Sequence, residues 1–111
     1  QDYKSGKVHI LNSDKNIINF SNNCSVSLPD DAESLNNCMY IACEMMDTKS
    51  GEKDAIYIAN IGPSWGEITL NCENTPELYC EDPKCQIKKQ WQPNTYKFDP
   101  APGYGAIVKL K

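Results

Sequence analysis

The middle of the chain carries its most regular apolar pattern. It reads Cys38-Met39-Tyr40-Ile41-Ala42-Cys43-Glu44-Met45-Met46, then the turn-forming stretch Asp47-Thr48-Lys49-Ser50-Gly51-Glu52-Lys53, then Ala55-Ile56-Tyr57-Ile58-Ala59-Asn60-Ile61. Short runs of β-branched and aromatic side chains on both sides of a glycine-containing turn are typical of a β-hairpin. The sequence therefore predicts a long antiparallel hairpin over residues 38–61.

Both predicted strands of this hairpin are apolar on both faces, because side chains alternate along a strand. One face is expected to carry Met39, Ile41, Cys43 and Met45 together with Ile56 and Ile58. The opposite face is expected to carry Tyr40 and Ala42 together with Tyr57 and Ala59. Strands that are apolar on both sides are typically covered on both sides. We therefore expect the hairpin to be central in its sheet.

Further short apolar runs flank the hairpin and are separated by polar turn formers. Strands are expected at residues 7–11, 16–20, 24–28, 67–72, 85–91, 95–98 and 104–110, with a hairpin turn at 12–15. One short helix is expected over residues 29–35, where a proline and several acids stand at the first turn. Seven to nine short strands predict one mainly β domain over residues 1–111, a small disulfide-stapled antiparallel sandwich or partly closed barrel.

The chain contains six cysteines, at positions Cys24, Cys38, Cys43, Cys72, Cys80 and Cys85. An even number at this density is typical of the disulfide framework of a secreted protein, so three bonds are expected. The two C-x4-C pairs lie at the outer limit of zinc-ligand spacing, but a four-thiolate site would leave Cys24 and Cys72 unexplained. We therefore expect disulfides and no metal.

Spacing narrows the choice of cysteine pairs. Cys38 and Cys43 are five residues apart in a predicted strand, which places their Cα atoms roughly 16 Å apart and their side chains on opposite faces. In contrast, Glu81-Asp82-Pro83-Lys84 is a turn-forming stretch that can bring Cys80 to Cys85. We expect a Cys80–Cys85 bond, with Cys24 and Cys72 shared between Cys38 and Cys43.

The charge of the chain argues against several classes of partner. The formal net charge is -4 with a pI near 4.9, and the basic residues are 11 lysines with no arginine. Nucleic acids and anionic membrane surfaces are bound through cations, and arginine is the usual group for gripping phosphates. No stretch approaches the ~20 apolar residues of a membrane span. We expect no nucleic-acid partner and no membrane span.

The beginning of the chain supports a secreted, extracellular location. It opens on Gln1 with no initiator methionine and no apolar leader, as expected of a mature product after removal of a signal peptide. Asn23-Cys24-Ser25 is a formal acceptor for a glycan, although the cysteine within it argues against modification.

The sequence offers little for catalysis. The single histidine, His9, lies in an alternating stretch, where a packing role is more common than a role as a base. Asp30, Asp31 and Glu33 are the carboxylates closest together, but they are better explained as the solvated start of a helix than as a calcium or glycosidase site. We find no cofactor motif. We therefore expect a protein that is not an enzyme and has no cofactor.

Binding through aromatic side chains on loops is the remaining hypothesis. The residues expected to bind are Trp65, Trp91, Lys84, Tyr79 and Tyr96. Loop aromatics are common anchors of protein interfaces and of sugar-stacking sites. The alternative is that both tryptophans fill the ends of a small core. Lys84, beside a cysteine in a proline-bearing turn, would suit the alternative of a serine-protease inhibitor.

Taken together, these patterns predict a secreted, non-catalytic binding protein that acts on an extracellular protein. The class expected is an effector of the toxin, venom, saliva or immune-modulator type, because small cysteine-rich chains without catalytic motifs commonly work through a surface. The alternatives are a carbohydrate-binding module with a glycan as its partner, a serine-protease inhibitor, and a small hydrolase.

Overall fold

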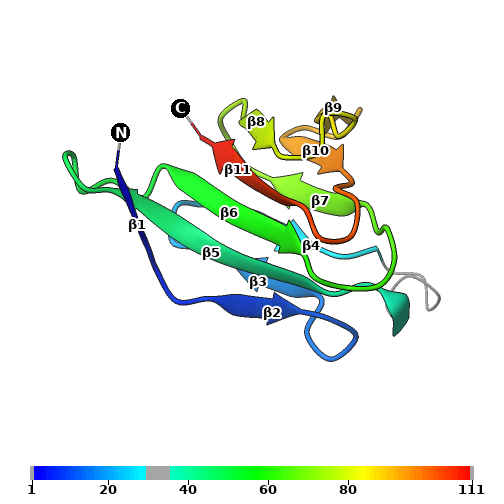
Figure 1. Ribbon diagram of the computed structural model, residues 1–111. Coiled ribbons are helices and arrows are strands. Elements are labelled where there is room, and N and C mark those ends of the chain that lie inside the picture. The colour runs from blue at the N-terminus through cyan, green and yellow to red at the C-terminus, as the bar shows by residue number, and fades with distance from the viewer. Residues whose placement is uncertain (1, 30–35, 111) are drawn as a thin grey trace.

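The computed structural model describes residues 2–29 and 36–110, which form two antiparallel β-sheets packed face to face (Figure 1). The six-stranded sheet consists of β1 (Tyr3–Ser5), β2 (His9–Leu11), β5 (Tyr40–Asp47), β6 (Ala55–Asn60), β8 (Glu77–Cys80) and β11 (Gly105–Lys109). The five-stranded sheet consists of β3 (Ile17–Asn19), β4 (Ser25–Ser27), β7 (Ile68–Asn71), β9 (Lys88–Lys89) and β10 (Thr95–Phe98). The expected mainly β sandwich is confirmed, and the sheets do not close into a barrel.

The order of strands in the larger sheet is β1-β5-β6-β11-β8, and β2 pairs with β5 on the same side as β1. In the smaller sheet the order is β3-β4-β7-β10-β9. The predicted hairpin over residues 38–61 is present as β5 and β6, which lie in the interior of their sheet. Its turn is closed by Gly51, which has a φ of 75° and donates its N–H to the carbonyl of Asp47 at 2.8 Å.

The hairpin predicted over residues 7–20 is wrong, because its two strands belong to different sheets. β2 pairs with β5, whereas β3 pairs with β4. The turn between them is formed as expected: the N–H of Asn12 donates to the carbonyl of Lys15 at 2.9 Å, and the Asn12 side chain accepts from the N–H of Asp14. The turn therefore carries the chain from one sheet to the other rather than back along the same sheet.

Other boundaries also differ from the sequence prediction. The described residues form eleven strands rather than seven to nine, and β1 and β8 had no counterpart in the prediction. The strand expected over residues 85–91 shortens to β9, which has two residues. The helix expected over residues 29–35 lies outside the described residues except for Pro29.

The predicted facing of the central hairpin is wrong by one residue in its cross-strand pairs. Ala42 lies opposite Ile58, and Cys43 lies opposite Tyr57. Because side chains alternate, a shift of one residue moves a whole set of partners to the other face. The inner face of the hairpin therefore joins Tyr40 and Ala42 to the isoleucines of β6, and its outer face joins Ile41, Cys43 and Met45 to Tyr57 and Ala59.

The core lies between the two sheets. Both inner faces supply completely or almost completely buried side chains, among them Leu11, Ile18, Val26, Tyr40, Ile56, Ile58, Ile68, Leu70, Phe98 and Val108. This apolar layer holds the sheets together. The described residues contain no helix that is long and apolar enough to cross a membrane.

Candidate interaction surface

The outer side of the six-stranded sheet is unusually apolar. We call this set of side chains the outer apolar face: Ile10, Ile41, Cys43, Met45, Tyr57, Tyr79 and Ile107. One row runs through directly opposed residues of four strands, from Cys43 to Tyr57, Ile107 and Tyr79. Beside it, Ile10 of β2 lies opposite Ile41 of β5. With strands about 4.8 Å apart, five strands give this face a width of roughly 19 Å.

The exposure of this face contrasts with the inner face of the same strands. Ile10 is 51% exposed and Tyr79 is 53% exposed, whereas Ile56 and Ile58, on the inner side of β6, are completely buried. Figure 1 shows two layers of strands, and within residues 2–29 and 36–110 no third layer covers the outer side of β5 and β6. A second sheet therefore covers the central strands on the inner side only, although Cys43 and Ala59 on the outer side are almost completely buried by neighbouring side chains.

Tyr79 is held in place at one end of the row. Its phenol donates a hydrogen bond of 2.7 Å to a carboxylate oxygen of Glu77, which raises the pKa of the phenol. The ammonium of Lys109 lies 5.3 Å from the centre of the Tyr79 ring, a cation–π contact. A fixed, half-exposed tyrosine loses little side-chain entropy on binding, so it suits the role of an interface anchor.

The centre of the face contains a small hollow beside the junction of β1 and β2. Its volume is about 250 Å³, and its lining includes Val8, Ile41, Cys43 and Tyr57. Cys43 is almost completely buried there, with its sulfur 3.8 Å from that of Met45. Removal from water raises the pKa of the Cys43 thiol. Cys43 therefore behaves as a small apolar side chain rather than a reactive thiolate.

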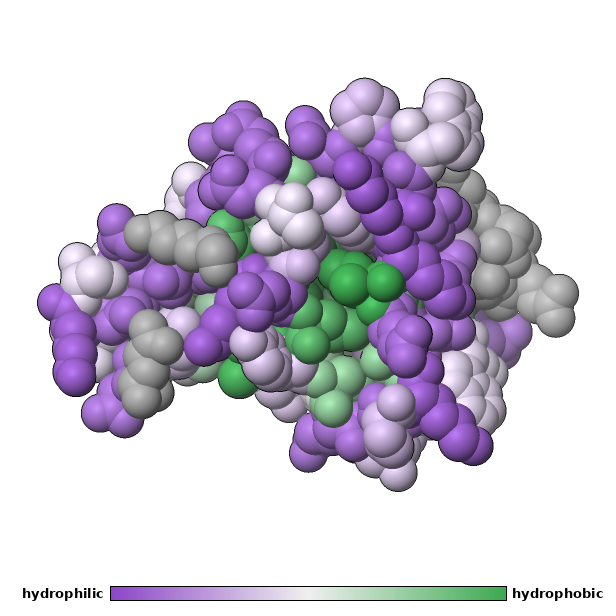
Figure 2. All heavy atoms as spheres, turned by 90° about the horizontal axis from the view of Figure 1, so that it is seen from above, coloured by the Kyte–Doolittle hydropathy of each residue, from purple (hydrophilic) through white to green (hydrophobic). Residues whose placement is uncertain are grey.

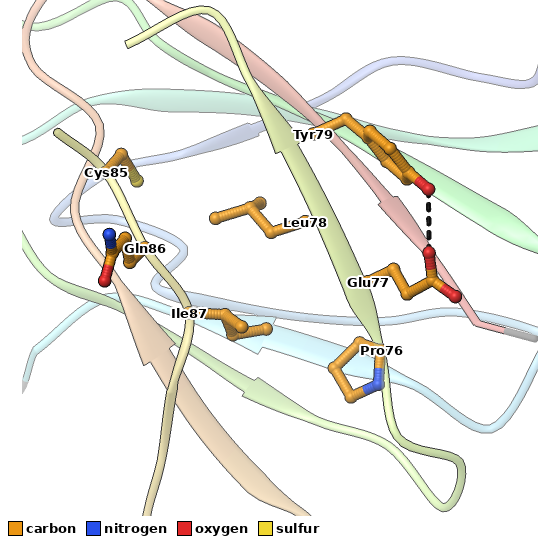
Figure 3. Close-up of a pocket in the computed structure, with 7 residues that line it drawn as sticks. All are labelled: Pro76, Glu77, Leu78, Tyr79, Cys85, Gln86 and Ile87. Atoms are coloured by element: carbon orange, nitrogen blue, oxygen red, sulfur yellow. Dashed lines mark hydrogen bonds between the residues drawn. The ribbon is translucent and has the colours of Figure 1, made fainter. Parts of the chain in front are cut away.

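A second hollow lies at the edges of the two sheets. Figure 2, seen from above, shows an apolar depression surrounded by hydrophilic side chains, and the strands uppermost in Figure 1 include β8 and β9. The hollow between β8 and residues 85–87 has a volume of about 410 Å³. In Figure 3, Leu78 and Ile87 point toward one another across it, while Tyr79 points to the other side of β8. Tyr79 therefore lies between the outer apolar face and this hollow.

The residues expected to bind do not form one site. Trp65, Trp91 and Lys84 are exposed, but they lie in three separate connections: β6 to β7, β9 to β10, and β8 to β9. Both tryptophans lie at the surface, at 65% and 89% exposure, so neither fills the core. The binding role expected for Tyr96 is not supported, because this side chain belongs to the core and is 6% exposed.

The backbone of the loop that carries Trp65 is held by two residues of the core. The phenol of Tyr40 donates a buried hydrogen bond of 2.5 Å to the carbonyl of Gly66. The Cys38 thiol lies 3.5 Å from the carbonyl oxygen of Trp65. A Cβ added at Gly66 would collide with the Cys38 sulfur, so only glycine fits at this close approach. The exposed indole of Trp65 therefore projects from a fixed backbone.

The six cysteines, all within the described residues, are not joined by disulfide bonds in the structure. Cys80 and Cys85 nevertheless lie close enough for a hydrogen bond between their thiols, and the pKa of Cys85 is raised to about 12, first by burial and then by this contact. Cys24 makes the same kind of contact with Cys72, and not with Cys38 or Cys43 as the sequence analysis expected.

The structure also places the histidine and the cysteines that were considered for catalysis and metal binding. His9 packs edge-on against Phe20, with 5.9 Å between the ring centres, on the inner side of β2. Cys38 is a core residue, whereas Cys43 lies on the outer side of β5, so the two C-x4-C pairs do not converge on one site. Within the described part of the chain, no group of three or more histidine, cysteine or acidic residues is placed to hold a metal ion. The acids at 30, 31 and 33 lie outside that part.

Comparison of the chain with protein-family models, with curated proteins and with solved structures found no match. The evidence for function is therefore the geometry of the chain itself. Ile10, Tyr57 and Ile107 were missed as candidate binding residues. The signal that pointed to them was the apolar character of both faces of the central strands, in a chain with few segments left to form a covering layer.

Proposed function

We propose that the protein is a secreted, non-catalytic binding protein that docks the outer apolar face against a flat, apolar surface of another extracellular protein. The observation that carries the proposal is the row from Cys43 through Tyr57 and Ile107 to Tyr79, which crosses four strands with no charged side chain within it. Apolar patches of this kind, bordered by polar residues, are typical of protein interfaces.

The surroundings of the row favour a protein partner over a glycan or an anionic surface. A flat sheet face packs well against another sheet or a helix, because side chains of the two layers interdigitate about 10 Å apart. Charges border the face at the Tyr79 end, where Lys109 and Glu77 hold the ring. Tyr79 would then be an anchor at one end of the interface, and these two charged residues would form part of the polar rim.

Location outside the cell is supported by the cysteines. Six cysteines in 111 residues are far more common in secreted proteins than in cytosolic ones, and two pairs of them lie side by side. The toxin, venom, saliva or immune-modulator class remains the preferred description of such an effector, because nothing in the described geometry requires a reaction.

The proposal is tested by capture with matched variants. Immobilised wild-type protein, Ile10→Glu, Ile107→Glu and the control Thr69→Glu are exposed to the same extracellular fluid. Thr69 lies between two core residues of β7 and faces outward from the other sheet, so it matches the others in secondary structure. We expect one protein to be retained by the wild type and by Thr69→Glu and to be lost from both isoleucine variants.

A direct measurement with the purified partner then completes the test. Each isoleucine variant should weaken binding at least tenfold while its melting temperature stays within a few degrees of the wild type. The proposal would be overturned if all four proteins retained the same set. It would also be overturned if the wild type alone ran as a dimer, because the face would then be an interface between two copies of this chain.

A further inference from the structure

We propose that Cys24 and Cys72 form a disulfide bond inside the sandwich, linking β4 to β7. The register of these strands carries the inference. Ser25 lies opposite Asn71 and Val26 lies opposite Leu70. One position further along the same ladder, Cys24 lies opposite Cys72. The inference does not depend on the proposed function.

The backbone shows which kind of cross-strand pair this is. The carbonyl of Cys24 accepts from the N–H of Phe20 at 2.8 Å, and the N–H of Cys72 donates to the carbonyl of Asn94 at 3.0 Å. The backbone groups of Cys24 thus point toward Phe20 and those of Cys72 point toward Asn94, so neither cysteine points its backbone groups at the other. In an antiparallel ladder this is a non-hydrogen-bonded pair, in which the Cα atoms are about 4.5 Å apart. That spacing lies within the range of disulfides, about 4.4–6.8 Å.

The side chains also point to the same side. Cys24 and Cys72 both belong to the core, at 5% and 3% exposure, together with Val26 and Leu70 two positions away. Their thiols are in hydrogen-bond contact, and the Cys72 thiol also donates to the carbonyl of Asn74 at 3.3 Å. The type of cross-strand pair, the shared face and the sulfur contact therefore agree.

The bond can be closed by a small disulfide such as oxidised glutathione. The thiolate of one of the two cysteines attacks one glutathione sulfur, so a mixed disulfide forms and one glutathione thiolate leaves. The other cysteine then loses its proton and attacks the protein sulfur of the mixed disulfide, which closes the protein disulfide and releases the second glutathione. The two protein thiols give two electrons to the glutathione disulfide, and their two protons end on the two glutathione molecules.

A hollow beside the pair gives the oxidant a place to approach. Its volume is about 280 Å³, and both cysteines form part of its lining. The rest of the lining is mostly polar: Asn19, Asn23, Ser25, Asn71, Glu73, Pro93 and Asn94. Asn23 has a φ of 61° in the turn between β3 and β4, directly before Cys24. This surface suits the polar groups of a small peptide disulfide.

The test is a peptide map of reduced protein that has been treated with oxidised and reduced glutathione. Remaining thiols are alkylated, and the chain is cleaved after lysine and glutamate without reduction. Such cleavage places Cys24, Cys72, Cys80 and Cys85 on four different peptides, while Cys38 and Cys43 share one. We expect a Cys24–Cys72 peptide, and the Cys80–Cys85 peptide serves as the positive control for oxidation.

Two outcomes would overturn the proposal: Cys24 or Cys72 joined to any other cysteine, or both alkylated under conditions that close Cys80–Cys85. Cys43→Ser should leave the map unchanged. No partner enters these measurements, so their failure would leave the proposed function untouched.

Discussion

Asn60, completely buried at the end of β6, donates from its side-chain amide to the carbonyl of Pro100 at 2.9 Å. The same amide donates to the carbonyl of Ser64 at 3.1 Å, and its oxygen accepts from the N–H of Gly62 at 3.0 Å. One side chain thereby fixes the loop that leads to β7 and the loop that leads to β11. Because all its hydrogen-bonding groups but one have partners, the buried amide carries little desolvation cost.

Replacing this amide should destabilise the whole domain. Asn60→Ala removes three hydrogen bonds and leaves the buried carbonyl of Pro100 and two partly buried groups without their partner, so we expect the free energy of unfolding to fall by about 2–4 kcal/mol. Urea denaturation followed by circular dichroism measures the loss. Asn74→Ala, at an exposed loop position, is the control and should change the value by less than about 0.5 kcal/mol. Equal effects of the two variants would contradict this role for Asn60.

The two tryptophans should contribute little to stability. Trp91 is 89% exposed, so Trp91→Ala should change the free energy of unfolding by less than about 0.5 kcal/mol, and Trp65→Ala by less than about 1 kcal/mol. Phe98→Ala, at a completely buried position, should cost about 3–5 kcal/mol in the same assay. A loss of 3 kcal/mol or more for either tryptophan variant would show that its indole packs in the core after all.

The sequence predicted the features that depend on local pattern. The β5–β6 hairpin was predicted because apolar strands and a turn containing Gly51 are adjacent in the chain. The approach of Cys80 to Cys85 was predicted for a similar reason, since the turn between them is only four residues long. Local turn chemistry is readable in one sequence because the interacting residues are neighbours.

The features that depend on pairing between distant segments were not predicted. The turn at Asn12 was predicted and is formed. Its residues do not determine, however, that β2 pairs with β5, some thirty residues later, and that β3 pairs with β4. The pairing of β5 with β6 was predicted incorrectly because both faces of both strands are apolar, so the alternation does not say which residues of β6 share a face with which residues of β5. The outer apolar face followed only once the register placed Tyr57 beside Cys43.

The two cysteine pairs should stabilise the domain unequally when oxidised. A bond from Cys24 to Cys72 closes a loop of about 49 residues, and one from Cys80 to Cys85 closes about six. The chain-entropy model assigns about 4 and about 2 kcal/mol to loops of these lengths.

Two double variants separate the contributions of the two bonds. Cys80→Ala/Cys85→Ala keeps the first pair, and Cys24→Ala/Cys72→Ala keeps the second. Denaturation of each variant, oxidised and reduced, gives the value for each bond. The reverse order would indicate that the Cys24–Cys72 geometry is strained or that the bond does not form.

Cys43 should make the stability of the protein depend on alkaline pH. Burial raises the pKa of its thiol in the folded state, whereas in the unfolded chain the pKa is about 8.5. Below about pH 8.5, the pKa of the thiol in the unfolded chain, Cys43 is protonated in both states, so its contribution to the free energy of unfolding is fully present. As the pH rises above about 8.5, the unfolded state releases its proton first, and the free energy of unfolding falls until the folded thiol also ionises.

The measurement compares the wild type with Cys43→Ser between pH 7.5 and 10. Every other titrating group is shared, including Tyr40, whose burial also raises its pKa. We therefore expect the wild type to lose more stability over this range than the variant does. In the folded wild type, Cys43 should also react with iodoacetamide more slowly at pH 8 than it does in denaturant, because less thiolate is present and little of the side chain is exposed. Parallel stability profiles for the two proteins, together with rapid alkylation of folded Cys43, would mean that the Cys43 side chain itself is open to water, and the hollow beside β1 and β2 would not be the apolar environment that the structure shows.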